Sequence, residues 1–194
     1  MLRRICVFCG SSTGARAEYR AAAETIAIEL TRRRIGLVFG GGCVGLMGIV
    51  ADTALARGGH VIGVIPSAMV AREIAHRGLP DLRIVASMHE RKALMASLSD
   101  AFIALPGGFG TFEEFCEVVT WTQLGLHQKP CGLLNVAGYY DPLVTLFDRA
   151  VADGFIRPEN RGIVLADSDP AALIERVLER PAAARPAVIQ PEEA

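Results

Sequence analysis

The chain is 194 residues long, 51% hydrophobic, and carries a formal net charge of −1. This length predicts one domain around a single hydrophobic core. The near-neutral charge gives no electrostatic reason to expect nucleic-acid binding or attachment to an anionic membrane. No apolar run approaches the length of a membrane span, and Met1-Leu-Arg-Arg leads directly into an apolar strand without a signal-type core. We therefore expect a soluble cytoplasmic protein whose partner is a small molecule.

Strand-like apolar runs alternate along the chain with stretches of helical length. The expected strands are 5–9, 36–39, 60–65, 82–85, 101–105, 131–134 and 163–165, and the expected helices are 15–33, 46–57, 89–97, 111–125, 140–153 and 170–179. Such alternation predicts an α/β fold, a Rossmann-like doubly wound parallel sheet in a single domain. Ligands of such sheets bind in the crevice at the carboxyl ends of the strands.

Two helix starts and a tail are visible in the composition. Asp141-Pro142 and Asp169-Pro170 each place a capping residue before a proline, which is typical of the first turn of a helix. From Pro181 the sequence becomes rich in proline and alanine, so we expect a flexible tail over 181–194.

The stretch Pro106-Gly-Gly-Phe-Gly-Thr-Phe-Glu-Glu114 directly follows an apolar run. It predicts a buried strand that turns sharply into a helix, where unpaired backbone N–H groups and the helix dipole favour an anion such as phosphate. Thr111 can add a hydroxyl donor. Glu113 and Glu114 fall in the expected first turn, and a phosphate cradle needs no acid there. Either one of them has another task, such as stabilising positive charge or orienting water, or both simply complement the helix dipole.

A second glycine cluster, Gly40, Gly41, Gly42, Gly45 and Gly48, follows the apolar run 35–39. Two strand-to-glycine-to-helix turns predict one anion site at the carboxyl ends of parallel strands. The spacing satisfies G-x-G-x-x-G, but the next strand ends Val-Ile-Pro-Ser without the carboxylate that holds the ribose of NAD. Neither cluster ends in Gly-Lys-Ser or Gly-Lys-Thr, which excludes a Walker A loop.

The positions of cysteine, histidine and lysine argue against a metal site and against a pyridoxal-phosphate enzyme. Cys6 and Cys9 form C-x-x-C inside an expected strand, where a spacing of three puts them on opposite faces, so we interpret them as buried small hydrophobic residues. The four histidines form no ligand pattern, and we expect no metal site. Lys92 and Lys129 are the only lysines. Lys92, beside Arg91, suggests an anion clamp more than the Schiff base of a pyridoxal-phosphate enzyme.

Five stretches together carry a family resemblance. They are Val7-Phe-Cys-Gly-Ser-Ser12, Gly40-Gly-Gly42, Met88-His-Glu-Arg-Lys92, Pro106-Gly-Gly-Phe-Gly-Thr-Phe-Glu-Glu114 and Thr120-Trp-Thr-Gln-Leu-Gly-Leu-His127. With these motifs the chain closely resembles the Lonely Guy family, the cytokinin riboside 5′-monophosphate phosphoribohydrolases that are often mislabelled lysine decarboxylases. The resemblance runs from about residue 5 to residue 178, and P-G-G-x-G-T-x-x-E is its most specific motif.

The resemblance implies a nucleotide-monophosphate-binding hydrolase domain over 1–180, with Arg91 and Glu114 as catalytic residues. It implies substrate binding by Glu73, Lys92, Gly108, Phe109, Gly110, Thr111, Phe112 and Glu113, and we place Gly41 and Gly42 with the phosphate turns. No metal or organic cofactor is implied. The substrate is expected to be an adenosine-type 5′-monophosphate, with adenine or an N6-prenylated adenine as the base.

The chemistry of this reaction suits the two charged residues. Loss of the base builds positive charge on the ribose ring, as in other glycosyl hydrolysis. A carboxylate beside the anomeric carbon, Glu114, stabilises that charge and can orient or deprotonate water. Arg91 offers a permanent planar charge for phosphate or for the departing base. Related folds also include molybdenum-cofactor carriers, so a non-catalytic nucleotide or cofactor carrier is the alternative, while a nucleic-acid-binding relative lacks a basic stripe.

The helix that follows the glycine motif predicts an oligomer. Its residues Phe112, Phe115, Cys116, Val119 and Leu126 are expected to pack on the sheet, and Val118, Trp121 and Thr122 to extend the apolar surface to another side. A helix that is apolar on more than one side needs a second partner, either a second subunit or the C-terminal helices of the same chain. The family resemblance also implies a homodimer, or a larger assembly of dimers, in which paired subunits complete each other's crevices.

Overall fold

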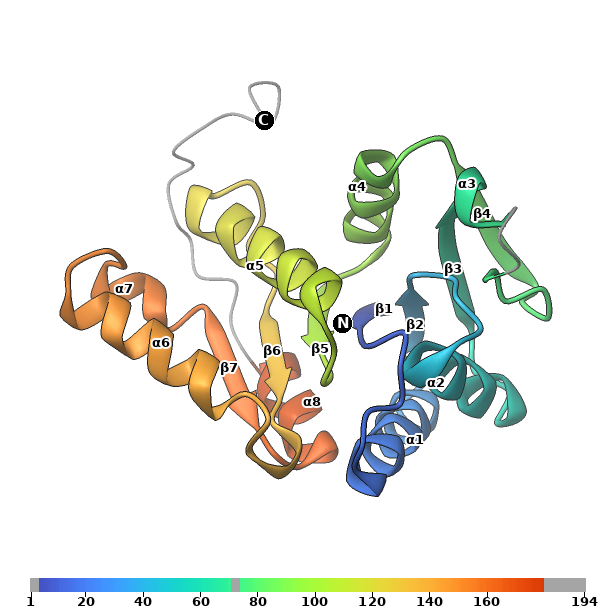
Figure 1. Cartoon of the computed structure of the whole chain (residues 1–194), viewed down its shortest axis with the longest axis horizontal. Coiled ribbons are helices and arrows are strands. Elements are labelled where there is room, and N and C mark those ends of the chain that lie inside the picture. Colours follow the sequence, from blue (N-terminus) through green and yellow to red (C-terminus); the bar gives the residue numbers. More distant parts are fainter. Residues whose placement is uncertain (1–3, 71–73, 180–194) are drawn as a thin grey trace.

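The computed structural model of the chain describes residues 4–70 and 74–179, and a single parallel sheet forms its centre (Figure 1). The strand order is β4-β3-β2-β1-β5-β6-β7, and each neighbouring pair is parallel. The strands are β1 (Arg4–Phe8), β2 (Gly36–Phe39), β3 (Val61–Pro66), β4 (Asp81–Val85), β5 (Ala101–Ala104), β6 (Cys131–Leu134) and β7 (Val164–Asp167). The expected α/β, Rossmann-like doubly wound sheet is confirmed.

Helices cover both faces of this sheet. They are α1 (Ala17–Arg32), α2 (Gly45–Ala56), α3 (Ser67–Val70), α4 (Met88–Leu98), α5 (Phe109–Leu124), the 3-10 turn η1 (Val136–Gly138), α6 (Asp141–Ala152), α7 (Pro158–Arg161) and α8 (Pro170–Glu179). Helices α1, α2 and α8 lie on one face, and α4, α5 and α6 lie on the other (Figure 1). Among the described helices, none combines the length and apolar character that a bilayer crossing requires.

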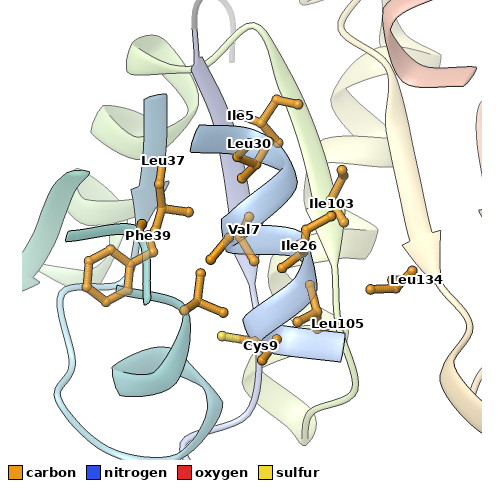
Figure 2. Close-up of a cluster of buried hydrophobic side chains, with 14 of the residues drawn as sticks. Ile5, Val7, Cys9, Ile26, Leu30, Leu37, Phe39, Ile103, Leu105 and Leu134 are labelled. Atoms are coloured by element: carbon orange, nitrogen blue, oxygen red, sulfur yellow. The ribbon is translucent and has the colours of Figure 1, made fainter. Parts of the chain in front are cut away.

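The core under α1 shows why β1 is apolar after its first residue, Arg4. Ile26 and Leu30 of α1 lie against β1, where Ile5 and Val7 point toward the helix (Figure 2). All four side chains are at most 1% exposed. The opposite face of β1 packs under α4 and α5, so residues 5–8 of this strand are buried between two helix layers and none of them needs to be polar.

Cys6 and Cys9 fall into the two different core layers, as the spacing predicted. Cys6 packs in the cluster under α4 and α5, and Cys9 packs in the cluster under α1. Both are free and buried, and burial raises the pKa of both thiols. The interpretation as small hydrophobic residues is confirmed.

Each of the expected strands and helices is present, with its ends displaced by at most two residues. The short elements α3, η1 and α7 were not expected, because four residues or fewer carry no hydrophobic period. The cap at Asp169 is confirmed, since its Oδ1 accepts the N–H of Ala172 at 2.8 Å. The cap at Asp141 was wrong. Asp141 lies inside α6, and its carboxylate accepts a hydrogen bond from Asn135 Nδ2 at 2.7 Å.

The packing side of α5 differs from the expectation. The buried residues of this helix are Thr111, Glu114, Phe115, Val118 and Thr122. Val118 and Thr122 therefore face the sheet, and the idea that they form a second apolar side was wrong. Cys116, expected on the sheet, is exposed. The hydrophobic pattern predicted a different sheet-facing side for α5. The observed sheet-facing side includes the polar residues Thr111 and Glu114, which a hydrophobic pattern does not select.

Candidate active site

A pocket of about 290 Å³ opens at the carboxyl ends of the strands. It lies where the topology reverses, since β1 sits between β2 and β5 and is followed by a helix on the face opposite α5. Its walls come from the segment after β1 and from α2, α3, α4 and α5, and the lining residues are Cys9, Gly10, Ser11, Met47, Met69, Met88, Arg91, Gly108, Phe109, Gly110, Thr111, Glu113 and Glu114.

The start of α5 forms one wall. The first intrahelical bond runs from Phe112 N–H to the Gly108 carbonyl at 3.1 Å, so the preceding N–H groups have no partner within the helix. Where a Cβ would stand on Gly108 or Gly110 there is open space. A ligand can therefore approach this backbone closely. Gly107 has a different task, because a Cβ there would lie 2.1 Å from Thr111 Oγ1.

Both acids of the motif lie beyond the first turn of α5, because the helix begins at Phe109, two residues earlier than predicted. The alternative that both acids merely complement the helix dipole is not supported, because the stabilisation of an acid by the dipole falls off within the first turn. Glu113 and Glu114 also point to different partners, as the angle between consecutive helical residues requires. Glu114 pairs with Arg91, whereas Glu113 pairs with Lys92.

The pair of Arg91 and Glu114 is the chemical centre of the pocket. Arg91 Nη1 lies 3.1 Å from Glu114 Oε1, and the two residues are only 7% and 9% exposed. Burial raises the pKa of Glu114, the positive charge of Arg91 lowers it, and the negative charge of Glu113 raises it again. The net shift is upward. A carboxylate of this kind is suited to proton exchange closer to neutral pH than a solvated glutamate.

The backbone of two strands fixes the Arg91 guanidinium. Its Nε donates to the Val64 carbonyl at 3.1 Å, and its Nη2 donates to the Gly40 carbonyl at 3.3 Å. A Cβ on Gly40 would lie 1.9 Å from Nη2. The first glycine of the second cluster therefore makes room for the arginine. The glycine spacing predicted a phosphate contact for this cluster and not this role, which depends on a contact between residues 51 positions apart.

Lys92 joins α4 to α5. Its Nζ lies 2.5 Å from Glu113 Oε1 and 2.9 Å from Glu117 Oε1. Burial lowers the pKa of Lys92, but these two hydrogen-bonded carboxylates outweigh that effect and the net shift is upward. Neither Lys92 nor Lys129, whose Nζ donates to the Ala96 carbonyl, lines the pocket. Among the described residues that line the pocket, none is a lysine that could form a Schiff base.

Gly41 and Gly42 are not brought to the pocket wall. Gly41 adopts a φ of +71°, and its carbonyl accepts the N–H of His76 at 2.8 Å. Gly42 forms an isolated antiparallel bridge with Ala75. This loop thus holds the segment from residue 74 onward. Neither glycine lines this pocket, and their contact with a phosphate stays a prediction. Glu73 lies outside the described residues.

Two aromatic residues of the motif have separate places. Phe109 is 91% exposed at the pocket. Phe112 turns away from it, and its ring lies 6.4 Å from the rings of both Tyr139 and Tyr140. Of the lining residues that were not predicted, Gly10 and Ser11 belong to a quoted motif, whereas Met47 and Met69 had no signal in the sequence.

Comparison with known proteins identifies the family. A family model described as "Possible lysine decarboxylase" matches residues 47–177. The chain is 54% identical over 177 residues to the probable cytokinin riboside 5′-monophosphate phosphoribohydrolase LOGL9 of Oryza sativa subsp. japonica, which covers 91% of this chain and 78% of the relative. The chain belongs to the Lonely Guy family.

A second relative supports the assignment to the Lonely Guy family, and a solved structure shares the fold. The cytokinin riboside 5′-monophosphate phosphoribohydrolase LOG7 of Arabidopsis thaliana is 52% identical over 177 residues, covering 91% of this chain and 82% of that protein. The molybdenum cofactor carrier protein of Chlamydomonas reinhardtii superposes with a TM-score of 0.71 at 20% identity, covering 93% of this chain and all of that one. At that identity the likeness shows a shared fold only.

Proposed function

We propose that this chain hydrolyses the N-glycosidic bond of adenosine-type 5′-monophosphates, N6-modified ones included, and releases the free base and ribose 5-phosphate. The observation that carries the proposal is the buried pair of Arg91 and Glu114 facing a pocket whose other wall is the open start of α5. The names of the relatives, which are 51 to 55% identical, state the same reaction for those proteins.

The substrate is oriented by its phosphate. The free N–H groups at the start of α5 and the Thr111 hydroxyl bind the 5′-phosphate, which the helix dipole also favours. The bare surfaces of Gly108 and Gly110 allow this approach. The ribose then lies over Glu114, one to two helical turns further along. A free nucleoside lacks the anchoring phosphate and is expected to react poorly.

Glu114 acts at the anomeric carbon. As the bond between C1′ and N9 breaks, its electron pair leaves with the base and the ribose becomes an oxocarbenium-like cation. The carboxylate stabilises this cation, and it takes a proton from the water whose oxygen bonds to C1′. That proton completes the neutral base. The sum is one water consumed, with one base and one ribose 5-phosphate formed.

Arg91 supports the same step by charge. It keeps Glu114 ionised against the effect of burial. Its fixed guanidinium also offers positive charge to the departing base, which gains electron density as the bond breaks. Glu113 and Lys92 are proposed substrate contacts on the ribose and phosphate side, and Glu73 and Phe109 are proposed contacts of the nucleotide. No metal or organic cofactor is part of the proposal.

The test compares three substrates. The protein is incubated with AMP, N6-isopentenyladenosine monophosphate and adenosine, without added cofactor, and the products are separated by chromatography. Base release from a monophosphate and much slower release from adenosine support the proposal. If neither monophosphate is cleaved at high enzyme concentration, the hydrolase assignment fails and the alternative of a non-catalytic nucleotide or cofactor carrier takes its place.

The proposal includes a cytoplasmic homodimer. Apolar side chains remain uncovered beside α5 and α6, with Leu146 60% exposed and Phe155 87% exposed. Val119 of α5 and Phe147 of α6 line a small groove of about 40 Å³. A symmetric pair of subunits is the commonest way to bury such a surface. Phe109 at the pocket mouth suits the expectation that paired subunits complete each other's crevices.

A further inference from the structure

Two consecutive tyrosines donate hydrogen bonds to the turn that opens α5. Tyr139 and Tyr140 lie between η1 and α6. The Tyr140 hydroxyl donates to the Leu105 carbonyl at 2.6 Å, and the Tyr139 hydroxyl donates to the Gly107 carbonyl. The Pro106 carbonyl between them accepts a backbone N–H of the segment after β1 at 3.1 Å. Three successive carbonyls of this turn therefore each have a donor from another part of the chain.

The loop that carries the tyrosines is itself held in place. Asn135 Oδ1 accepts the Tyr140 N–H at 2.7 Å, and Asn135 Nδ2 donates to the Asp141 carboxylate. The Tyr139 ring packs edge-on against Tyr19 of α1, with the ring centres 5.7 Å apart. The Tyr139 hydroxyl therefore belongs to a ring whose position is fixed by packing and by the loop backbone.

The peptide bond between Gly107 and Gly108 is the one in this turn that most needs such a contact. Because glycine has no Cβ, two flanking glycines allow the peptide plane to turn more freely than other residues would. In a trans peptide the carbonyl and the following N–H point in opposite directions, and none of the described peptide bonds is cis. The Tyr139 hydroxyl, which holds the Gly107 carbonyl, therefore directs the Gly108 N–H away from the tyrosine.

Two hollows lie on the two sides of this peptide. Tyr139 and Gly107 line a hollow of about 230 Å³ between the starts of α1 and α5, whereas Thr111 and Glu114 line the active-site pocket. Gly108 lines both. Since the Gly107 carbonyl faces Tyr139, the Gly108 N–H faces the active-site pocket. This N–H is one of those that α5 leaves without a partner inside the helix, so it is available to a ligand.

We propose that Tyr139 is a positioning residue, which orients the Gly108 N–H toward the 5′-phosphate of the substrate without touching the substrate itself. Its hydrogen bond to the carbonyl also polarises the peptide, which strengthens the bond that the N–H can donate. This inference rests on the proposed function. Tyr140 provides the matched control, because its partner Leu105 precedes Pro106, which has no N–H to orient.

The experiment compares the unmodified protein with Tyr139→Phe and Tyr140→Phe, each of which loses one hydroxyl and keeps its ring. Calorimetry gives the Kd for ribose 5-phosphate, and product release gives KM and kcat for AMP. For Tyr139→Phe both Kd and KM are expected to rise by about fivefold, the scale of one neutral hydrogen bond. The value of kcat is expected to stay unchanged, because the phosphate is bound alike before and during bond cleavage. The inhibition constant of adenosine, which has no phosphate, should also stay unchanged.

The control separates positioning from stability. Tyr140→Phe leaves a buried carbonyl without its donor, so its Tm is expected to fall while Kd for ribose 5-phosphate and KM for AMP stay unchanged. Equal rises of Kd in both variants, or a lower Tm with an unchanged Kd in Tyr139→Phe, would overturn the positioning role and leave the hydrolase in place. A matching rise in the adenosine inhibition constant would overturn it too, in favour of a general distortion of the pocket. If the unmodified protein releases no base from AMP, the proposed function fails, and the Kd values for ribose 5-phosphate still decide the role of Tyr139.

Discussion

Arg91 is the residue on which the site geometry depends. It makes one contact to the Glu114 carboxylate and two to the backbone carbonyls of Val64 and Gly40, so its planar charge cannot rotate freely. Position 40 must be glycine for this arrangement to exist. Gly40 therefore determines where the positive charge of Arg91 lies, because it leaves the space that the guanidinium occupies.

Gly40→Ala is therefore expected to lower kcat by about 10²-fold, the scale of a misplaced catalytic group. The added methyl displaces the guanidinium, and Glu114 loses its partner. Gly162→Ala is the control, because its Cβ would meet its nearest neighbour only at 4.0 Å. Steady-state kinetics with AMP, together with circular dichroism to verify folding, make the measurement. Full activity in the Gly40 variant would show that the position of Arg91 does not matter.

At the scale of elements, two packed helices supply the charged groups of the site. Lys92 of α4 holds Glu113 and Glu117 of α5, and the same pair of helices carries Arg91 and Glu114. Lys92 also lowers the pKa of Glu114, against the raising effects of burial and of the neighbouring acids. Lys92 thus links the contact between α4 and α5 to the protonation state of Glu114.

The pH dependence of activity follows from this connection. Activity requires ionised Glu114, whose pKa is raised by burial, so kcat/KM is expected to fall with decreasing pH above the ordinary glutamate range. Lys92→Met removes a positive charge that lowers the Glu114 pKa. The acid limb of the kcat/KM profile should then move to still higher pH. An acid limb that stays in place, or moves to lower pH, would contradict this link between Lys92 and Glu114.

The whole molecule shows how far sequence reasoning extends. The alternation of apolar runs and helical stretches was sufficient for the α/β fold, and the motifs led to Arg91 and Glu114, because both signals are local. The role of Gly40 and the engagement of Gly41 with His76 depend on contacts between distant segments, which no local pattern encodes. The packing side of α5 was misjudged for a related reason, since Glu114 is buried through its pairing with Arg91 of another helix, which the hydrophobic pattern of α5 does not indicate.

Assembly is also a property of the whole molecule. The apolar surface at Leu146 and Phe155 predicts a dimer of about twice the 20.7 kDa chain mass in light scattering at micromolar concentration. Leu146→Lys combined with Phe155→Lys is expected to shift the mass toward the monomer, because a buried interface does not tolerate unpaired charge. A fully active monomer in the unmodified protein would remove both the dimer and the idea of a shared crevice.

The central claim is that Glu114 is the carboxylate that acts on the ribose. The most direct measurement follows adenine and ribose 5-phosphate released from AMP in phosphate-free buffer by the unmodified protein, Glu114→Gln and Glu113→Gln. We expect equimolar products from the unmodified protein, a fall in kcat of at least about 10²-fold for Glu114→Gln, and for Glu113→Gln a change mainly in KM. Full product release by Glu114→Gln, or loss of kcat only in Glu113→Gln, would contradict the account.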